Sequence, residues 1–162
     1  MATSRRRAVL MGLLMCAMSG SLFLGASSAS ADPAPQFCTL DLSTGSYTCA
    51  GSQAQARLAG QVAGAGTQTI LGRFFDDPDK SGANGWFQVT ATSGCDGSLD
   101  LDWALNVMPS GWNDRISSFQ AYANCDVRLF ANGFLTGSVY GPSTSANSLG
   151  SMDNQTSSIG FY

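Results

Sequence analysis

The hydrophobic and polar positions change pattern near residue 67, after which short apolar runs are separated by Gly, Asp, Asn and Pro. Such runs, bounded by turn-forming residues, are typical of the strands of an all-β protein. The clearest alternation predicts a strand with Leu99, Leu101 and Trp103 on one face and Asp100 and Asp102 on the other. The remaining predicted strands cover residues 70–75, 86–91, 117–122, 126–130, 137–140 and 157–161. About eight short strands favour two packed Greek keys in one β-sandwich.

The N-terminal part of the chain has its own pattern. Residues 37–49 alternate apolar and polar positions around a turn at 43–45, which predicts a β-hairpin. Next, Ser52 is a candidate N-cap for a short helix that ends at Gly64 and Gly66. We expect this piece to be an extension with little core of its own.

The first 31 residues have the order of a secretory signal. Three arginines, Arg5 to Arg7, precede an apolar stretch at 8–24, and Ala29-Ser30-Ala31 follows. We expect cleavage before Asp32 by the ordinary secretory route, with a twin-arginine signal as the alternative. The expected segments of this secreted, extracellular protein are a signal peptide at 1–31, an N-terminal extension at 32–66 and a sandwich domain at 67–162.

The charged residues narrow the range of partners. Without the signal, the chain has five basic residues against eleven aspartates and no glutamate. An acidic surface repels phosphate backbones and attracts cations, so nucleic acid is a poor candidate partner. No later apolar run approaches the roughly 18 residues of a membrane span, and we expect no membrane partner. We expect a monomer.

The residue types also argue against catalysis. The chain has no histidine, which removes the commonest general base and the commonest transition-metal ligand. It also lacks a Gly-x-Ser-x-Gly motif and a phosphate loop, so nothing supplies an activated nucleophile. We therefore expect no enzyme, and a hydrolase that uses only carboxylates is the remaining enzymatic alternative.

Four cysteines follow the signal, and an even number in an oxidising compartment predicts two disulfides. Three pairings are possible. We prefer Cys38–Cys49, which closes the short hairpin, and Cys95–Cys125, which ties two later strands together.

A hexapeptide occurs twice in the second half of the chain. Residues 113–118 are Asn-Asp-Arg-Ile-Ser-Ser, and residues 153–158 are Asp-Asn-Gln-Thr-Ser-Ser. Both have two Asn or Asp residues, two variable residues and two serines. Each copy follows an aromatic residue that lies seven positions before a glycine, so the chain is duplicated. These pairs are Phe75 with Gly82 and Phe130 with Gly137.

On this duplicated motif, residues 67–162 resemble the microbial βγ-crystallins, of the actinobacterial type. The resemblance implies an all-β, double Greek-key sandwich in which each key ends in the hexapeptide. It also implies two calcium sites where the keys exchange loops. Lys80 departs from the family pattern, which commonly has an aromatic residue there. The segment from glycine to hexapeptide is also longer in the first key, so the resemblance is closer for the hexapeptides than for Asp76.

The resemblance implies a role for each residue of the two sites. The serines at the fifth position, Ser117 and Ser157, would give side-chain oxygens. The residues at the second position, Asp114 and Asn154, would reach across to the opposite site. Backbone carbonyls would come from Arg115, Gln155, Asp76 and Ala131. The hexapeptides begin with Asn113 and Asp153, which complete the two sets.

Calcium suits such a set because it accepts six to eight oxygens of mixed type, whereas magnesium needs stricter geometry and zinc favours nitrogen or sulfur. Few charged ligands imply an affinity on the order of micromolar to millimolar. The alternative interpretation of the hexapeptides is structural, with serine hydroxyls capping turns. The alternative function is a secreted protease inhibitor, with an extracellular protease as partner, or an antimicrobial, killer-toxin-like protein. Such a protein would act through an extended loop at 94–109.

Overall fold

The computed structural model describes residues 36–56 and 68–162. The predicted signal peptide and the end of the predicted helix lie outside the described residues. Residues 53–56 are helical, and Ser52 Oγ accepts a hydrogen bond from the backbone N–H of Gln55 at 3.3 Å, which confirms the predicted N-cap. No helix in the described part of the chain is both long and apolar enough to span a membrane.

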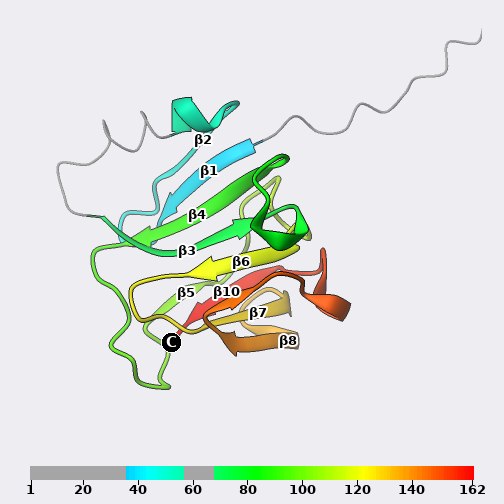
Figure 1. Cartoon of the computed structure of the whole chain (residues 1–162). Helices are drawn as coiled ribbons and strands as arrows, with labels where there is room; N and C mark the ends of the chain where they lie inside the picture. The colour runs from blue at the N-terminus through cyan, green and yellow to red at the C-terminus, as the bar shows by residue number, and fades with distance from the viewer. Residues whose placement is uncertain (1–35, 57–67) are drawn as a thin grey trace, which may run out of the picture. The chain divides into compact units, whose positions relative to one another are not determined.

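Ten strands in the described residues form two sheets (Figure 1). The first sheet has the order β2 (Tyr47–Ala50), β1 (Gln36–Asp41), β4 (Gly85–Ala91), β3 (Thr69–Phe75), β6 (Ser118–Ala121) and β9 (Ser145–Ala146). The second has the order β5 (Trp103–Leu105), β10 (Ser158–Phe161), β7 (Val127–Asn132) and β8 (Thr136–Ser143). Two short 3₁₀ helices, η1 (Pro78–Lys80) and η2 (Gly150–Met152), precede β4 and β10.

The strand order confirms the predicted double Greek key. Strands β4, β3 and β6 come from the first repeat, and β9 of the second repeat pairs with β6 at the edge of their sheet. Strands β8, β7 and β10 come from the second repeat, and β5 of the first repeat pairs with β10 at the edge of the second sheet. Each repeat therefore lends one strand to the other sheet, and the same order of four strands occurs twice.

The N-terminal hairpin extends the first sheet. Strand β1 pairs antiparallel with β2 and parallel with β4, with Phe37 opposite Trp86 and Leu40 opposite Val89. The Cys38 side chain is fully buried in the main core. The predicted extension thus shares the core of the sandwich through β1.

Both predicted disulfides are confirmed. Cys38–Cys49 joins β1 to β2 at directly opposite positions. Cys95–Cys125 joins two loops that precede β5 and β7.

The main core lies between the two sheets and is rich in aromatic rings. Phe74 of β3 is fully buried, and its ring centroid lies 5.9 to 6.1 Å from those of Phe87, Phe119 and Phe161. Phe87 and Phe119 belong to the first sheet, whereas Phe161 belongs to the second. Burial of these rings at about 25 cal/mol per Å² of apolar surface is the main force that holds the two sheets together.

The strand predicted at residues 99–103 is wrong. Only Trp103 belongs to a strand, at the start of β5, and residues 97–100 form a bend. Leu99 and Leu101 are 74% and 46% exposed, so they do not face the core. Asp100 and Asp102 consequently do not form a polar strand face.

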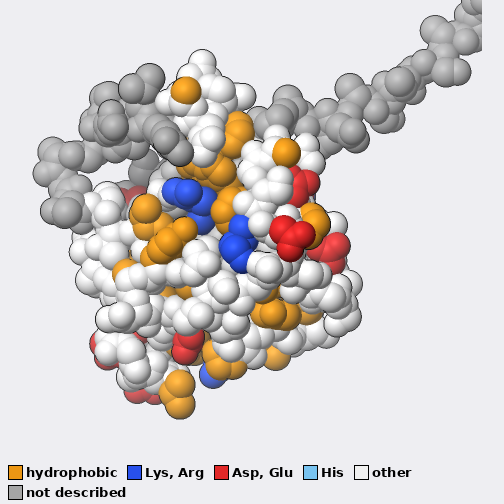
Figure 2. Space-filling model, in the orientation of Figure 1, with side chains coloured by type: hydrophobic (Ala, Val, Ile, Leu, Met, Phe, Trp, Pro, Cys, Tyr) orange, Lys and Arg blue, Asp and Glu red, His pale blue; other side chains and the backbone are white. Residues whose placement is uncertain are grey.

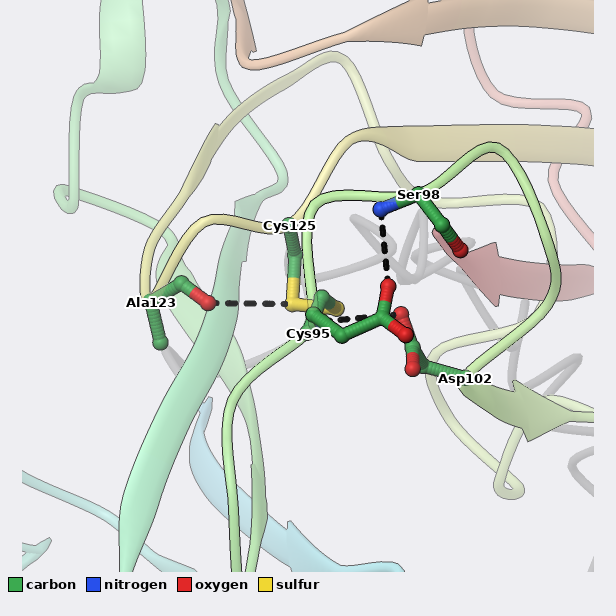
Figure 3. The surroundings of a disulfide bond; sticks show 6 residues. Cys95, Ser98, Asp102, Ala123 and Cys125 are labelled. Atoms are coloured by element: carbon green, nitrogen blue, oxygen red, sulfur yellow. Dashed lines mark hydrogen bonds between the residues drawn. A yellow bond between two sulfur atoms is a disulfide. The ribbon is translucent and has the colours of Figure 1, made fainter.

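Short polar side chains explain why this segment bends (Figure 3). The carboxylate of Asp96 accepts a hydrogen bond from the backbone N–H of Ser98 at 2.7 Å, and the carboxylate of Asp102 accepts one from the N–H of Asp96 at 3.3 Å. These bonds lie next to the Cys95–Cys125 disulfide, which fixes the start of the loop. Side-chain bonds to the backbone therefore replace the strand pairing that the alternation predicts.

Candidate metal centre

The two hexapeptides lie side by side where β6 and β10 begin. The backbone N–H of Asp114 donates to the carbonyl of Thr156 at 3.0 Å, and the N–H of Asn154 donates to the carbonyl of Ile116 at 3.0 Å. These two bonds are equivalent, because each joins the second position of one hexapeptide to the fourth position of the other. The loops that end the two Greek keys thus form a symmetric pair.

The same arrangement brings side-chain oxygens together across the pair. Ser117 Oγ lies 3.4 Å from Asn154 Oδ1, and Ser157 Oγ lies 3.4 Å from Asp114 Oδ1. Two oxygens that bind one calcium ion at about 2.4 Å lie about 3.4 Å apart when their bonds meet at a right angle. Each serine hydroxyl donates a hydrogen bond to its partner oxygen at this distance, and the same spacing also fits two ligands of one calcium ion.

The backbone explains why the second position holds Asp or Asn. Asp114 and Asn154 have φ angles of 57° and 54°, in the left-handed region. Most side chains are strained there, whereas Asn and Asp tolerate it because their short polar groups bond locally. In each loop the acid or amide suits the left-handed turn and also carries an oxygen that faces the other loop.

The residues at the first position support those at the second. Asn113 Nδ2 donates to Asp114 Oδ2 at 2.7 Å, and Asn154 Nδ2 donates to Asp153 Oδ2 at 3.4 Å. Gln155 is exposed, and its amide donates to the carbonyl of Ser151 at 2.8 Å. The structure thus links Asn113 and Asp153 to the residues of the oxygen pairs, whereas the Gln155 side chain bonds Ser151 instead.

The aromatic residues of the repeat position the serines. The backbone N–H of Ser117 donates to the carbonyl of Phe75 at 2.9 Å, and that of Ser157 donates to the carbonyl of Phe130 at 2.8 Å. Asp76 and Ala131 directly follow these aromatic residues. Asp76 and Ala131 are two of the four residues whose carbonyls the resemblance gives as ligands. Each therefore directly follows a residue whose backbone bonds Ser117 or Ser157.

The sixth-position serines hold turns, as the structural interpretation of the hexapeptides expects. Ser158 is fully buried; its hydroxyl donates to the carbonyl of Asn132 at 2.6 Å and accepts from the N–H of Leu135 at 3.0 Å. Ser118 makes the same pair of bonds with the carbonyl of Asp77 and the N–H of Lys80, at 2.6 and 2.9 Å. Each serine holds the turn that follows the first strand of its repeat.

Arg115 distinguishes the first hexapeptide from the second. Its guanidinium Nη2 lies 2.7 Å from Asp76 Oδ2. Its carbon Cζ lies 4.8 Å from the ring centroid of Trp112, a fully buried residue that stacks on Phe87. The signal for this ion pair is absent from the local sequence, because the two residues are 39 positions apart.

The side-chain oxygens that the structure brings together are two hydroxyls, one amide and one carboxylate. Within residues 36–56 and 68–162, no three His, Cys, Asp or Glu side chains come together as a metal-binding group. On the face drawn in Figure 2, acidic side chains (red) gather at two edges. These mostly neutral oxygen ligands suit a hard cation such as calcium, whereas transition metals favour nitrogen or sulfur ligands.

No protein-family model matches the chain, and no curated protein matches it. The chain is similar to the solved N-terminal domain of protein S, at 21% identity and a TM-score of 0.42, over 57% of this chain and 94% of that one. It is also similar to a doubly substituted βγ-crystallin domain from Clostridium beijerinckii, at 20% identity and a TM-score of 0.40, over 58% of this chain and 98% of that one. At these values the likeness carries no argument about function, and the double Greek-key fold rests on the strand order.

Proposed function

We propose that this protein binds two calcium ions at the paired hexapeptides and that the ions stabilise its fold. The observation that carries the proposal is the pair of equal oxygen spacings, Ser117 with Asn154 and Ser157 with Asp114. One site would contain the Asp114 carboxylate and the other only neutral side-chain ligands. Because calcium affinity rises with the number of charged ligands, the Ser157–Asp114 site is expected to bind more tightly.

The proposed setting is outside the cell. Two disulfides support an oxidising compartment, and the N-terminal sequence is that of an export signal. Extracellular calcium is abundant enough to fill sites of modest affinity.

Calcium titration by calorimetry tests the proposal. The wild-type protein is expected to show two binding events, and the variant that combines Ser117→Ala with Ser157→Ala is expected to lose both. The matched control combines Ser138→Ala with Ser151→Ala, two exposed serines outside the oxygen pairs. No heat from the wild-type protein at millimolar calcium would reject calcium binding, and equal binding by the double variant would reject the ligand assignment.

A second candidate function rests on the loop before β5. Leu99 and Leu101 in this loop expose 74% and 46% of their surface, and the Cys95–Cys125 disulfide anchors its start. Exposed loops on a rigid scaffold often carry binding residues, and a disulfide that restrains such a loop lowers the entropy cost of binding a partner. Under this hypothesis the calcium-free protein inhibits a thermolysin-like protease at stoichiometric amounts, or arrests fungal growth. Absence of both effects would remove this candidate and leave calcium binding unaffected.

A further inference from the structure

The ion pair between Asp76 and Arg115 belongs to one candidate site alone. Arg115 Nη2 and Asp76 Oδ2 are 2.7 Å apart, and the two side chains are 17% and 20% exposed. The equivalent positions of the second repeat hold Gln155 and Ala131, which carry no charge. The two sites therefore have the same backbone plan and different electrostatics.

Arg115 is held in place by groups other than Asp76. Its Nη1 donates to the carbonyl of Gly111 at 2.7 Å and to Gln36 Oε1 at 3.4 Å. Its guanidinium also lies over the ring of Trp112, a geometry that favours a cation. An ordinary surface ion pair is weak because two long side chains must be ordered to form it. Here the arginine is already ordered, so it remains next to the Asp76 carboxylate.

We propose that Arg115 sets the calcium affinity of the Ser117–Asn154 site by keeping the Asp76 carboxylate from the ion. This inference rests on the proposed calcium binding. Asp76 follows Phe75, whose carbonyl accepts the N–H of Ser117, so the backbone of Asp76 begins next to the serine of this site. While Arg115 neutralises the Asp76 carboxylate, the site offers the ion only uncharged oxygens. Removal of Arg115 releases one carboxylate at the site, and calcium affinity rises with each such charge.

The test is a double-mutant cycle on the Ser117–Asn154 site. Ser157→Ala is present in every protein to silence the other site, and calcium affinity is measured by calorimetry. Arg115→Gln introduces the residue type found in the second hexapeptide, and its affinity is expected to rise on the order of tenfold. A unit charge about 6 Å from a divalent ion in a high-dielectric surrounding gives that factor. Asp76→Asn is expected to lower the affinity, because it leaves an unpaired cation near the ion.

The variant with both substitutions is the decisive one. Its net charge at these two positions is zero, as it is for the Arg115–Asp76 ion pair. The calcium affinity of this variant is therefore expected to return to within about threefold of the starting protein. If Arg115→Gln instead weakens calcium binding as Asp76→Asn does, the pair holds the loops together and the proposal is overturned. A site that becomes measurable only in the Arg115→Gln protein counts as the expected increase.

Arg73→Gln is the matched control, because it removes the same charge from another arginine that lies over a tryptophan. Arg73 bonds Gln88 and lies 4.8 Å from the ring centroid of Trp86. An equal rise in affinity in this control would assign the effect to net charge and overturn the proposal. If the wild-type protein binds no calcium, the proposed function fails together with this inference. If it binds calcium and Arg115→Gln leaves the affinity unchanged, only this inference fails.

Discussion

At the scale of single residues, the two serines of each hexapeptide have separate tasks. Ser117 and Ser157 place their hydroxyls next to an acid or amide oxygen of the other loop. Ser118 and Ser158 are fully buried and hold the turn after the first strand of their repeat. The Ser-Ser pattern thus joins a candidate ligand to a structural hydroxyl.

Ser158→Ala is expected to destabilise the calcium-free protein by about 1–2 kcal/mol, because it deletes both hydrogen bonds of a fully buried hydroxyl. The partners of this hydroxyl are the carbonyl of Asn132 and the N–H of Leu135. Urea unfolding in the presence of a chelator measures the change. Ser138→Ala, at an exposed serine, is the control and is expected to change stability by less than about 0.5 kcal/mol. Equal stability of both variants would show that the buried hydroxyl is dispensable.

Asp41 gives the stability a dependence on pH. Burial by itself raises the pKa of this carboxyl, but hydrogen bonds from Thr44, Ser43 and Gln68 outweigh it and lower the pKa below its usual value. A folded pKa below the unfolded one means that the carboxylate stabilises the fold above about pH 4. This contribution is lost as the pH falls through the folded pKa.

Asp41→Asn is therefore expected to lower the urea midpoint at pH 7, by an amount that shrinks as the pH falls below about 4. Comparison of the urea midpoints of variant and wild type across this range measures the effect. Asp100→Asn, at an exposed carboxylate, is the control. A difference between wild type and Asp41→Asn that stays constant from pH 7 to pH 3 would contradict the assignment.

At the scale of elements, the sequence predicts best where a strand is fixed by its own pattern. Residues 70–75 and 157–161 were predicted as strands, and β3 (Thr69–Phe75) and β10 (Ser158–Phe161) confirm them within one residue at each end. The strand predicted at 99–103 is wrong because Asp96 and Asp102 bond the local backbone. The parallel pairing of β1 with β4 was also beyond the sequence, because pairing depends on where two distant strands meet.

The candidate site likewise has a part that the sequence predicts and a part that it does not. Its hexapeptides could be recognised because each is a continuous run of sequence. The second position of each holds Asp or Asn, which tolerate the left-handed backbone found there. The contact of Arg115 with Asp76, and that of Gln36 with Arg115, could not be predicted, because packing alone brings these residues together. Local chemistry was therefore predictable, and the electrostatic difference between the two sites was not.

Gly85 tests the docking of the N-terminal hairpin. Its φ is +115°, and a Cβ at this position would lie 2.0 Å from the carbonyl oxygen of Gln36 in β1. Gly85→Ala is expected to cost about 2–4 kcal/mol, from backbone strain together with this clash. Hydrogen exchange should show lost protection in β1 before the rest of the first sheet. Gly51→Ala, where a Cβ meets nothing within 4 Å, is the control. Full protection of β1 in Gly85→Ala would show that the backbone adjusts without undocking.

At the scale of the whole molecule, the hexapeptides join the two halves of the duplicated fold. The first lies before β6 of one sheet and the second before β10 of the other, and their backbones bond each other. An ion shared by the oxygen pairs would therefore bridge the two sheets and bind only the folded chain. Calcium at about one hundred times its dissociation constant stabilises a folded protein by about 2.7 kcal/mol for each site.

The melting temperature in calcium is thus expected to exceed that in chelator by several degrees, since about 1 kcal/mol shifts a domain of this size by a few degrees. Scanning calorimetry at several calcium concentrations measures the shift, which should grow with the logarithm of calcium once the sites fill. Magnesium at equal concentration is the control for ionic strength, because its strict octahedral geometry suits these mixed ligands poorly. The combined Ser117→Ala and Ser157→Ala variant should melt at the same temperature with and without calcium. A shift of the same size in that variant would place the stabilising ion elsewhere on the molecule.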